Sequence, residues 1–138
     1  MEQSIQSFPA RLDALPDVFA YLDDYAGLFD TNSNTLIRIR IVIEELFTNT
    51  VCHGSRQSNQ DVVTIQIHRE SESIHVKYED SCLAFNPLDG LECLADQLNH
   101  PLETRKEGNI GRLLVKHLAD SVHYKHEDGK NQIEMVFL

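Results

Sequence analysis

Apolar residues recur at intervals of three and four along two long segments, which predicts two amphipathic helices. The first apolar stripe lies within residues 12–29, and a polar break separates it from a second helix expected over residues 35–52. We expect the second helix to be largely buried, because Ile37, Ile41 and Val42 widen its apolar stripe. The stripe itself comprises Leu36, Ile39, Ile43, Leu46 and Phe47.

Shorter segments alternate apolar and polar residues, as strands with one buried face do. Two such runs, at residues 63–67 and 74–78, are joined by a short turn at residues 70–73 and predict an antiparallel hairpin. The turn residues Asp128-Gly129 predict a second hairpin near the end of the chain. A short strand at residues 4–8 is expected before the first helix.

Residues 81–107 show no clear periodicity and contain Pro87 and Gly90, with a short helix-like piece at residues 91–98. A long segment without regular structure is often a functional lid. Another helix is expected from just after Gly108 to residue 118. Because the helices cluster instead of alternating strictly with strands, we expect an α+β fold, with one sheet and helices on one face.

The length of 138 residues predicts a single domain spanning residues 1–138. No apolar run has the length of a membrane-spanning helix, and no export signal is visible at the N-terminus. The net charge of −10 argues against a nucleic-acid partner, since binders of nucleic acid carry a basic patch. It is compatible with basic protein partners or with no partner at all.

The cysteines, Cys52, Cys82 and Cys93, are odd in number and contain no close pair. This usage predicts a reduced, cytoplasmic location. A zinc site is not expected, because no Cys-x-x-Cys motif occurs.

Glu45 and Asn49 are the first candidate functional residues, because a spacing of four places them on one face of the second helix. A carboxylate and an amide there could hold a divalent cation and orient an attacking hydroxyl group. The alternative is a solvated surface pair, since glutamates are mostly exposed.

Asp80 and the Gly-Asn-Ile-Gly segment at residues 108–111 are further candidates. Asp80 ends an apolar strand, where a carboxylate could accept a hydrogen bond from an exocyclic amine such as that of adenine, or could simply begin a turn. Glycines at the start of a helix let backbone N–H groups approach a phosphate, although they also occur in flexible helix starts.

Taken in this order, the three segments resemble the motifs of the GHKL ATPase superfamily. Residues 43–54 (IEELFTNTVCHG) resemble its asparagine-containing helix, residues 79–88 (EDSCLAFNPL) its adenine box and residues 108–115 (GNIGRLLV) its glycine box. The Phe-Asn-Pro-Leu and His-Gly endings are most similar to the small bacterial anti-sigma-factor serine/threonine kinases of stress-response and sporulation switches. The resemblance spans nearly the whole chain. It implies a two-layer α/β sandwich of the GHKL (Bergerat) type, with a mixed, mostly antiparallel sheet and an ATP lid at about residues 86–107.

The resemblance also implies ATP and Mg²⁺ as cofactors and a role for each motif residue. Asn49 would ligate the Mg²⁺ that bridges the nucleotide phosphates, and Glu45 would be the general base for a substrate serine hydroxyl. Asp80 would bind the adenine amine, while Gly108 and Gly111 would cradle phosphates.

Four other residues lie close to these motifs in the sequence. His53 and Gly54 would shape the floor of the site. Arg105 and Lys106, at the end of the lid, are either positive charges beside the phosphates or ordinary solvated residues.

The chain departs from the family pattern at three positions. Cys82 and Ala84 stand where the adenine box usually or often has glycine, and Asn109 stands in the glycine box where glycine is common. Glycine permits an unusual backbone and a close approach to a ligand, so a cysteine would strain the loop or crowd the adenine pocket.

Two functions of different classes follow. The first is an ATP-dependent anti-sigma kinase that phosphorylates a small anti-sigma-factor antagonist on serine and binds a sigma factor; a homodimer is also compatible with this branch. The second is a degenerate pseudokinase that regulates a partner by contact alone, which Cys82 and Ala84 favour. A detached histidine-kinase ATPase domain is a weaker third, because no helix with a phosphoacceptor histidine precedes the domain and the Phe-Asn-Pro ending argues against it.

Overall fold

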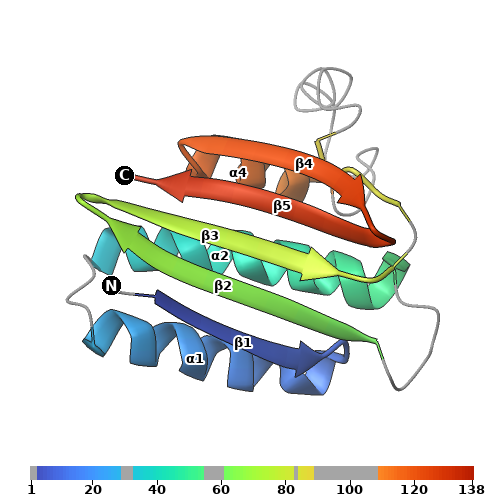
Figure 1. Ribbon diagram of the computed structural model, residues 1–138, viewed down its shortest axis with the longest axis horizontal. Coiled ribbons are helices and arrows are strands. Elements are labelled where there is room, and N and C mark those ends of the chain that lie inside the picture. Colours follow the sequence, from blue (N-terminus) through green and yellow to red (C-terminus); the bar gives the residue numbers. More distant parts are fainter. Residues whose placement is uncertain (1–2, 29–32, 55–60, 83, 89–108) are drawn as a thin grey trace.

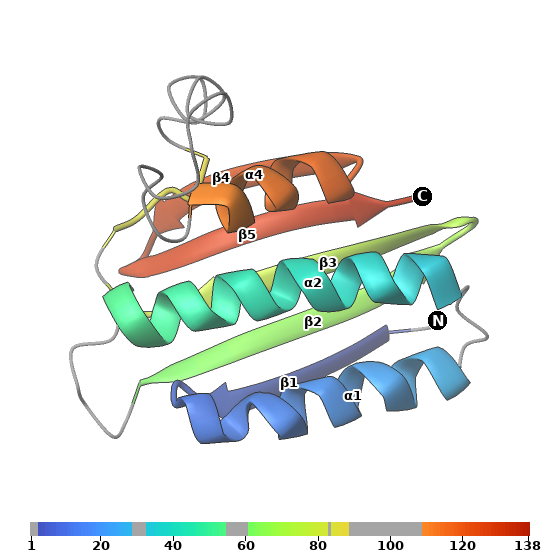
Figure 2. The ribbon, with the colours of Figure 1, turned by 180° about the vertical axis from the view of Figure 1, so that it is seen from behind.

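The computed structural model describes residues 3–28, 33–54, 61–82, 84–88 and 109–138. These residues form a sheet with helices on a single face, which Figures 1 and 2 show from the two sides. The elements in chain order are β1 (Gln3–Pro9), η1 (Leu12–Ala14), α1 (Leu15–Leu28), α2 (Ser33–Asn49), η2 (Thr50–Gly54), β2 (Val62–Glu70), β3 (Ser73–Asp80), α4 (Asn109–Leu118), β4 (Ser121–Glu127) and β5 (Lys130–Phe137).

The sheet has five strands in the order β1-β2-β3-β5-β4, and its four pairings are all antiparallel. The final strand, β5, lies between β3 and β4, so it is an interior strand of the sheet. This order brings Asp80, the last residue of β3, opposite Asn131 near the start of β5. The α+β fold with one helical layer, predicted from the sequence, is confirmed.

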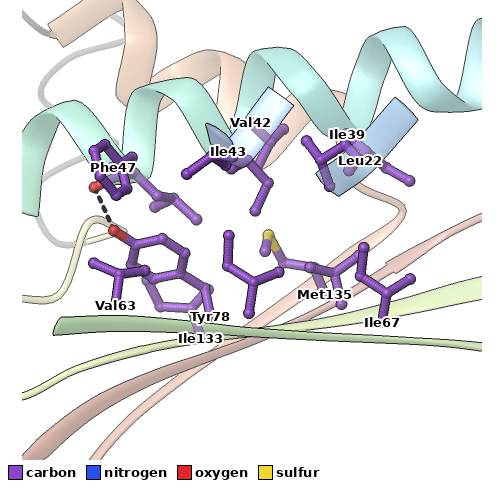
Figure 3. Close-up of a cluster of buried hydrophobic side chains, with 14 of the residues drawn as sticks. Leu22, Ile39, Val42, Ile43, Phe47, Val63, Ile67, Tyr78, Ile133 and Met135 are labelled. Carbon is purple, nitrogen blue, oxygen red and sulfur yellow. Dashed lines mark hydrogen bonds between the residues drawn. The ribbon is translucent and has the colours of Figure 1, made fainter. Parts of the chain in front are cut away.

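The hydrophobic core lies between the sheet and the helical layer, where α1, α2 and α4 all contribute buried residues. In Figure 3, Ile39, Val42, Ile43 and Phe47 of α2 project toward side chains of the sheet. Each fully buried side chain of this size contributes about 1.5–3 kcal/mol to stability. The residues of the sheet that are labelled there are Val63, Ile67, Tyr78, Ile133 and Met135, all nearly inaccessible to solvent.

Both predicted hairpins are confirmed. Asp128 and Gly129 have φ values of 56° and 75°, the left-handed conformation that a tight hairpin turn needs. In the first hairpin Glu70 pairs with Ser73, so the turn itself is Ser71 and Glu72, with Ser71 at a φ of 58°.

The prediction that Ile37 and Ile41 widen the buried stripe of α2 is wrong. They are 54% and 38% exposed, whereas Val42 is fully buried. Ile37 lies two residues from the buried Ile39, about 200° around the helix, and therefore on the far face. The boundaries of the helix also differ from the expected residues 35–52. The α-helix begins at Ser33 and ends at Asn49, where a wider π-helical turn, η2, follows.

The predicted lid lies outside the described residues apart from residues 86–88, and so does the helix-like piece at residues 91–98.

No helix in the described ranges combines the length and apolarity needed to cross a membrane.

Candidate active site

Asp80 is buried at the end of β3, with an exposed fraction of 8%. Its Oδ1 accepts hydrogen bonds from Asn131 Nδ2 at 2.8 Å and from the Cys82 backbone N–H at 3.2 Å. Its Oδ2 accepts from the Thr50 hydroxyl at 2.8 Å. Donors therefore hold the carboxylate on both oxygens, and Oδ2 keeps room for a further donor. An aspartate that begins a turn accepts a hydrogen bond from the backbone two residues later, as Asp80 does from Cys82. Asp80 therefore stabilises the turn and also lines a pocket.

A chain of hydroxyl groups orients the Asp80 carboxylate. The Tyr78 and Thr50 oxygens are 2.6 Å apart, and they lie 3.1 and 3.0 Å from the carbonyl oxygen of Leu46. Each hydroxyl has one proton, and bonds to a carboxylate are the stronger ones. We therefore assign the Thr50 proton to Asp80 and the Tyr78 proton to Thr50. Burial raises the pKa of Tyr78 well above its usual value, so the phenol stays protonated as a donor.

Asn131 connects β5 to the loop that follows β3. Its Oδ1 accepts from the Phe85 backbone N–H at 3.1 Å and from the Tyr124 hydroxyl at 2.5 Å, while its Nδ2 donates to Asp80. Sequence reasoning assigned no role to Asn131 or Thr50. Thr50 follows Asn49 directly, which is a local signal. The tail that contains Asn131 resembles the same family branch, but its bond to Asp80 follows only from the β3–β5 register.

A small pocket lies beside these residues, and Cys82 is part of its lining. The pocket volume is about 20 Å³, room for about one water molecule, so a purine ring requires the loop with Cys82 and Phe85 to move. Positive φ values in the described chain occur at Ser71, Asp128 and Gly129, so Cys82 does not have the left-handed backbone that would strain a cysteine. The lining residues are Leu46, Asn49, Thr50, Tyr78, Asp80, Cys82, Phe85, Pro87, Asn131 and Ile133.

Glu45 and Asn49 are half-buried and contact each other across one turn of α2. Asn49 Nδ2 donates to Glu45 Oε1 at 3.1 Å, which directs the Asn49 carbonyl oxygen elsewhere. Asn49 lines the same pocket as Asp80. A fully solvated surface pair is therefore excluded, and a residue whose side-chain amide oxygen suits a divalent cation lines the pocket.

Gly111, in the glycine segment, lies against the side chain of Glu45. A Cβ atom built at Gly111 would overlap the Glu45 carboxylate, so a larger residue cannot occupy this position unless Glu45 moves. Helices α2 and α4 pack side by side here (Figure 2). All three sequence motifs therefore meet at one end of the helical layer, although Gly111 is the only glycine of its segment that the structure describes.

The other predicted site residues are placed only in part. Gly108, Arg105 and Lys106 lie outside the described residues, while His53 and Gly54 fall within η2.

Arg112, which sequence reasoning did not single out, fastens α4 to the loop after β3. Its Nε donates to the Pro87 carbonyl oxygen at 3.0 Å, and its guanidinium lies 5.6 Å from the centre of the Phe85 ring.

The sequence of the chain matches the model of a known protein family. A family model described as a histidine kinase-like ATPase domain matches residues 8–137. The chain belongs to this family. The GHKL resemblance seen in its motifs is thereby confirmed, and no curated protein matches the chain.

Two solved structures show the same fold. The RsbU and RsbW domains of a Mycobacterium tuberculosis protein match with a TM-score of 0.67 at 12% identity, over 98% of this chain and 31% of that one. The histidine kinase domain of a blue-light activated histidine kinase from Erythrobacter litoralis matches with a TM-score of 0.56 at 16% identity, over 94% of this chain and 61% of that one. The chain thus spans less than two thirds of either structure.

Gly111→Ala is expected to leave the fold stable but to displace Glu45. The added methyl group meets the end of a flexible side chain, and alanine favours a helix over glycine by about 1 kcal/mol. We expect a melting temperature at or above that of the wild type, together with an at least tenfold loss of any phosphotransfer that uses Glu45.

Gly27→Ala in α1 is the matched control, because an added Cβ there has no neighbour within 4 Å. It should stabilise the fold without affecting activity. Unchanged phosphotransfer in Gly111→Ala would show that the position of Glu45 does not matter.

Proposed function

We propose that this domain is an ATP-dependent serine/threonine protein kinase that acts as an anti-sigma regulatory factor. The observation that carries the proposal is the meeting of the Glu45–Asn49 pair, Gly111 and the Asp80 pocket at one end of the helical layer. The anti-sigma branch is supported by the sequence endings described above and by the fold likeness to a structure that contains an RsbW domain.

The described residues fit ATP and a hard divalent cation. Asp80 Oδ2 accepts one hydrogen bond from Thr50 and has capacity for another from an exocyclic amine. The carbonyl oxygen of Asn49 is a ligand type that Mg²⁺ prefers, and the helix that contains Gly111 begins close by. ATP with Mg²⁺ supplies the transferable phosphoryl group; in this proposal Asp80 binds the base, Asn49 holds the cation and Gly108 and Gly111 approach the phosphates.

Glu45 is the proposed general base. Its Oε1 accepts from Asn49, a residue that lines the pocket, and this bond orients the carboxylate. The carboxylate would accept the proton of a serine hydroxyl as that oxygen attacks phosphorus. Phosphoryl transfer by protein kinases depends mostly on positioning and electrostatics. The bond from Asn49 contributes to positioning because it fixes the Glu45 carboxylate.

The proposed partners are a sigma factor and a small anti-sigma-factor antagonist with a phosphoacceptor serine. The net charge of −10 favours partners whose contact surfaces are basic. A homodimer remains part of the proposal, as does a single domain over residues 1–138 with its lid at about residues 86–107.

Calorimetric titration with ATP, with and without Mg²⁺, tests the proposal first. We expect saturable binding that Mg²⁺ strengthens and, at 100 times the dissociation constant, stabilisation of the fold by about 2.7 kcal/mol. Absence of both heat and thermal shift at millimolar nucleotide would exclude the kinase. Transfer of labelled phosphate to a serine of an antagonist protein then tests the chemistry.

The alternative is a regulator that acts by contact alone, and the small volume of the pocket that Cys82 helps to line supports it. Cys82→Gly should tighten ATP binding by about tenfold, or roughly 1.4 kcal/mol, because it removes a side chain that lines the pocket. The exposed Cys52 provides the control, since Cys52→Ser removes a thiol outside the pocket lining. Wild-type protein that binds no nucleotide, together with a Cys82→Gly variant that does, would establish the alternative.

A further inference from the structure

The β2–β3 hairpin brings two histidines and a glutamate together, far from the pocket. His68 and His75 are direct partners across the two strands, and their rings stack with centroids 4.7 Å apart. Glu70 Oε2 lies 3.1 Å from His75 Nε2. One potential ligand atom from each of the three side chains lies within 4.8 Å of the other two.

We propose that His68, Glu70 and His75 bind one borderline transition-metal ion, with Zn²⁺ as the reference ion. Imidazole nitrogens and a carboxylate oxygen form a donor set that suits Zn²⁺, Cu²⁺ and Ni²⁺, and three protein ligands leave a position for water. The contact between Glu70 and His75 leaves a position that either a proton on Nε2 or a metal ion can fill, because an unprotonated Nε2 and a carboxylate oxygen both accept. At 3.1 Å they need either a proton or a metal ion between them.

A hydroxyl group and a hollow adjoin the three side chains. The Ser73 hydroxyl donates to the Glu70 carbonyl oxygen at 2.9 Å, so its oxygen is the acceptor for a proton on His75 Nε2, 3.1 Å away. A metal ion bound at Nε2 would replace this proton. A hollow on the helix-free face of the sheet is lined by both histidines and gives an ion access from solvent. A metal ligated across two strands would also fix the register of the hairpin.

This site is separate from the proposed Mg²⁺–ATP site. The hairpin turn and Asp80 are at opposite ends of β3 (Figure 1), and His75 precedes Asp80 by five residues, or about 17 Å along a strand. Mg²⁺ prefers oxygen ligands, so it should not compete for a site with two imidazoles. Zn²⁺ binding at the hairpin is therefore independent of the proposed kinase activity.

Calorimetric titration of metal-free protein with ZnCl₂ tests the proposal. We expect one Zn²⁺ per chain and binding that excess MgCl₂ does not alter. His68→Asn and His75→Asn should each weaken binding by at least tenfold, and Glu70→Gln should weaken it by severalfold. His126→Asn, which changes an exposed histidine on β4, is the matched control and should bind Zn²⁺ as the wild type does.

Nuclear magnetic resonance of the histidine rings in the wild-type protein gives a second test that needs no substitution. Zn²⁺ should shift the ring signals of His68 and His75 and leave those of His126 in place. Three results would overturn the proposal: no binding, unchanged affinity in both histidine variants, or one ion per two chains, which would indicate an ion bridging two molecules.

Discussion

Glu45→Gln is expected to reduce phosphoryl transfer to a serine-bearing partner by about 10²–10⁴-fold, the usual contribution of a general base. The glutamine oxygen can still accept the hydrogen bond from Asn49, so the geometry of the pair is preserved. The affinity for Mg²⁺–ATP should therefore stay close to that of the wild type, because a general base acts on the hydroxyl and not on the nucleotide. Single-turnover transfer and calorimetry separate the two effects.

Glu44→Gln provides the control for this experiment. Glu44 precedes Glu45 on α2 and carries the same charge, but it is exposed. If the two variants lose the same amount of transfer, the effect is one of general charge and the proposed role of Glu45 fails.

Asp80→Asn is expected to weaken ATP binding by about 100-fold, or roughly 2.8 kcal/mol. An amide nitrogen would replace one carboxylate oxygen and oppose the exocyclic amine of the base with a second donor. The loss of folding stability should be smaller, about 1 kcal/mol, the net contribution of one hydrogen bond.

The small stability cost follows from the hydroxyl chain beneath Asp80. An asparagine can keep its oxygen toward Asn131 and Cys82 and donate from its nitrogen to Thr50. Thr50 then turns its proton to the Leu46 carbonyl oxygen, which is already 3.0 Å away.

Calorimetry with ATP and chemical denaturation measure the two quantities for Asp80→Asn. Glu79→Gln is the control, because Glu79 precedes Asp80 on β3 but bonds Gln132 and Lys130 instead of the network beneath the pocket. Unchanged ATP affinity in Asp80→Asn, with stability lost, would show that Asp80 only forms the turn.

Local pattern was sufficient for most of the fold. The helices and both hairpins follow from apolar spacings of three to four or of two residues, because each element must turn one face toward the core. The pairing of Glu45 with Asn49 was also predictable, since a spacing of four places two side chains on one helical face. The cross-strand pairing of His68 with His75 also follows from the turn at residues 70–73, although no motif in the sequence marks these two histidines as ligands.

Only the tertiary structure decided which distant residues share the site. Asn131 bonds Asp80 from 51 residues away because β5 inserts between β3 and β4, and strand order depends on packing between elements. Gly111 has no room for a larger side chain, because α4 packs beside α2 and places Gly111 against the Glu45 carboxylate. The exposure of Ile37 and Ile41 was likewise set by which face of α2 the sheet covers. Periodicity defines the faces of an element, whereas the contact of one face with another is a long-range property of the folded chain.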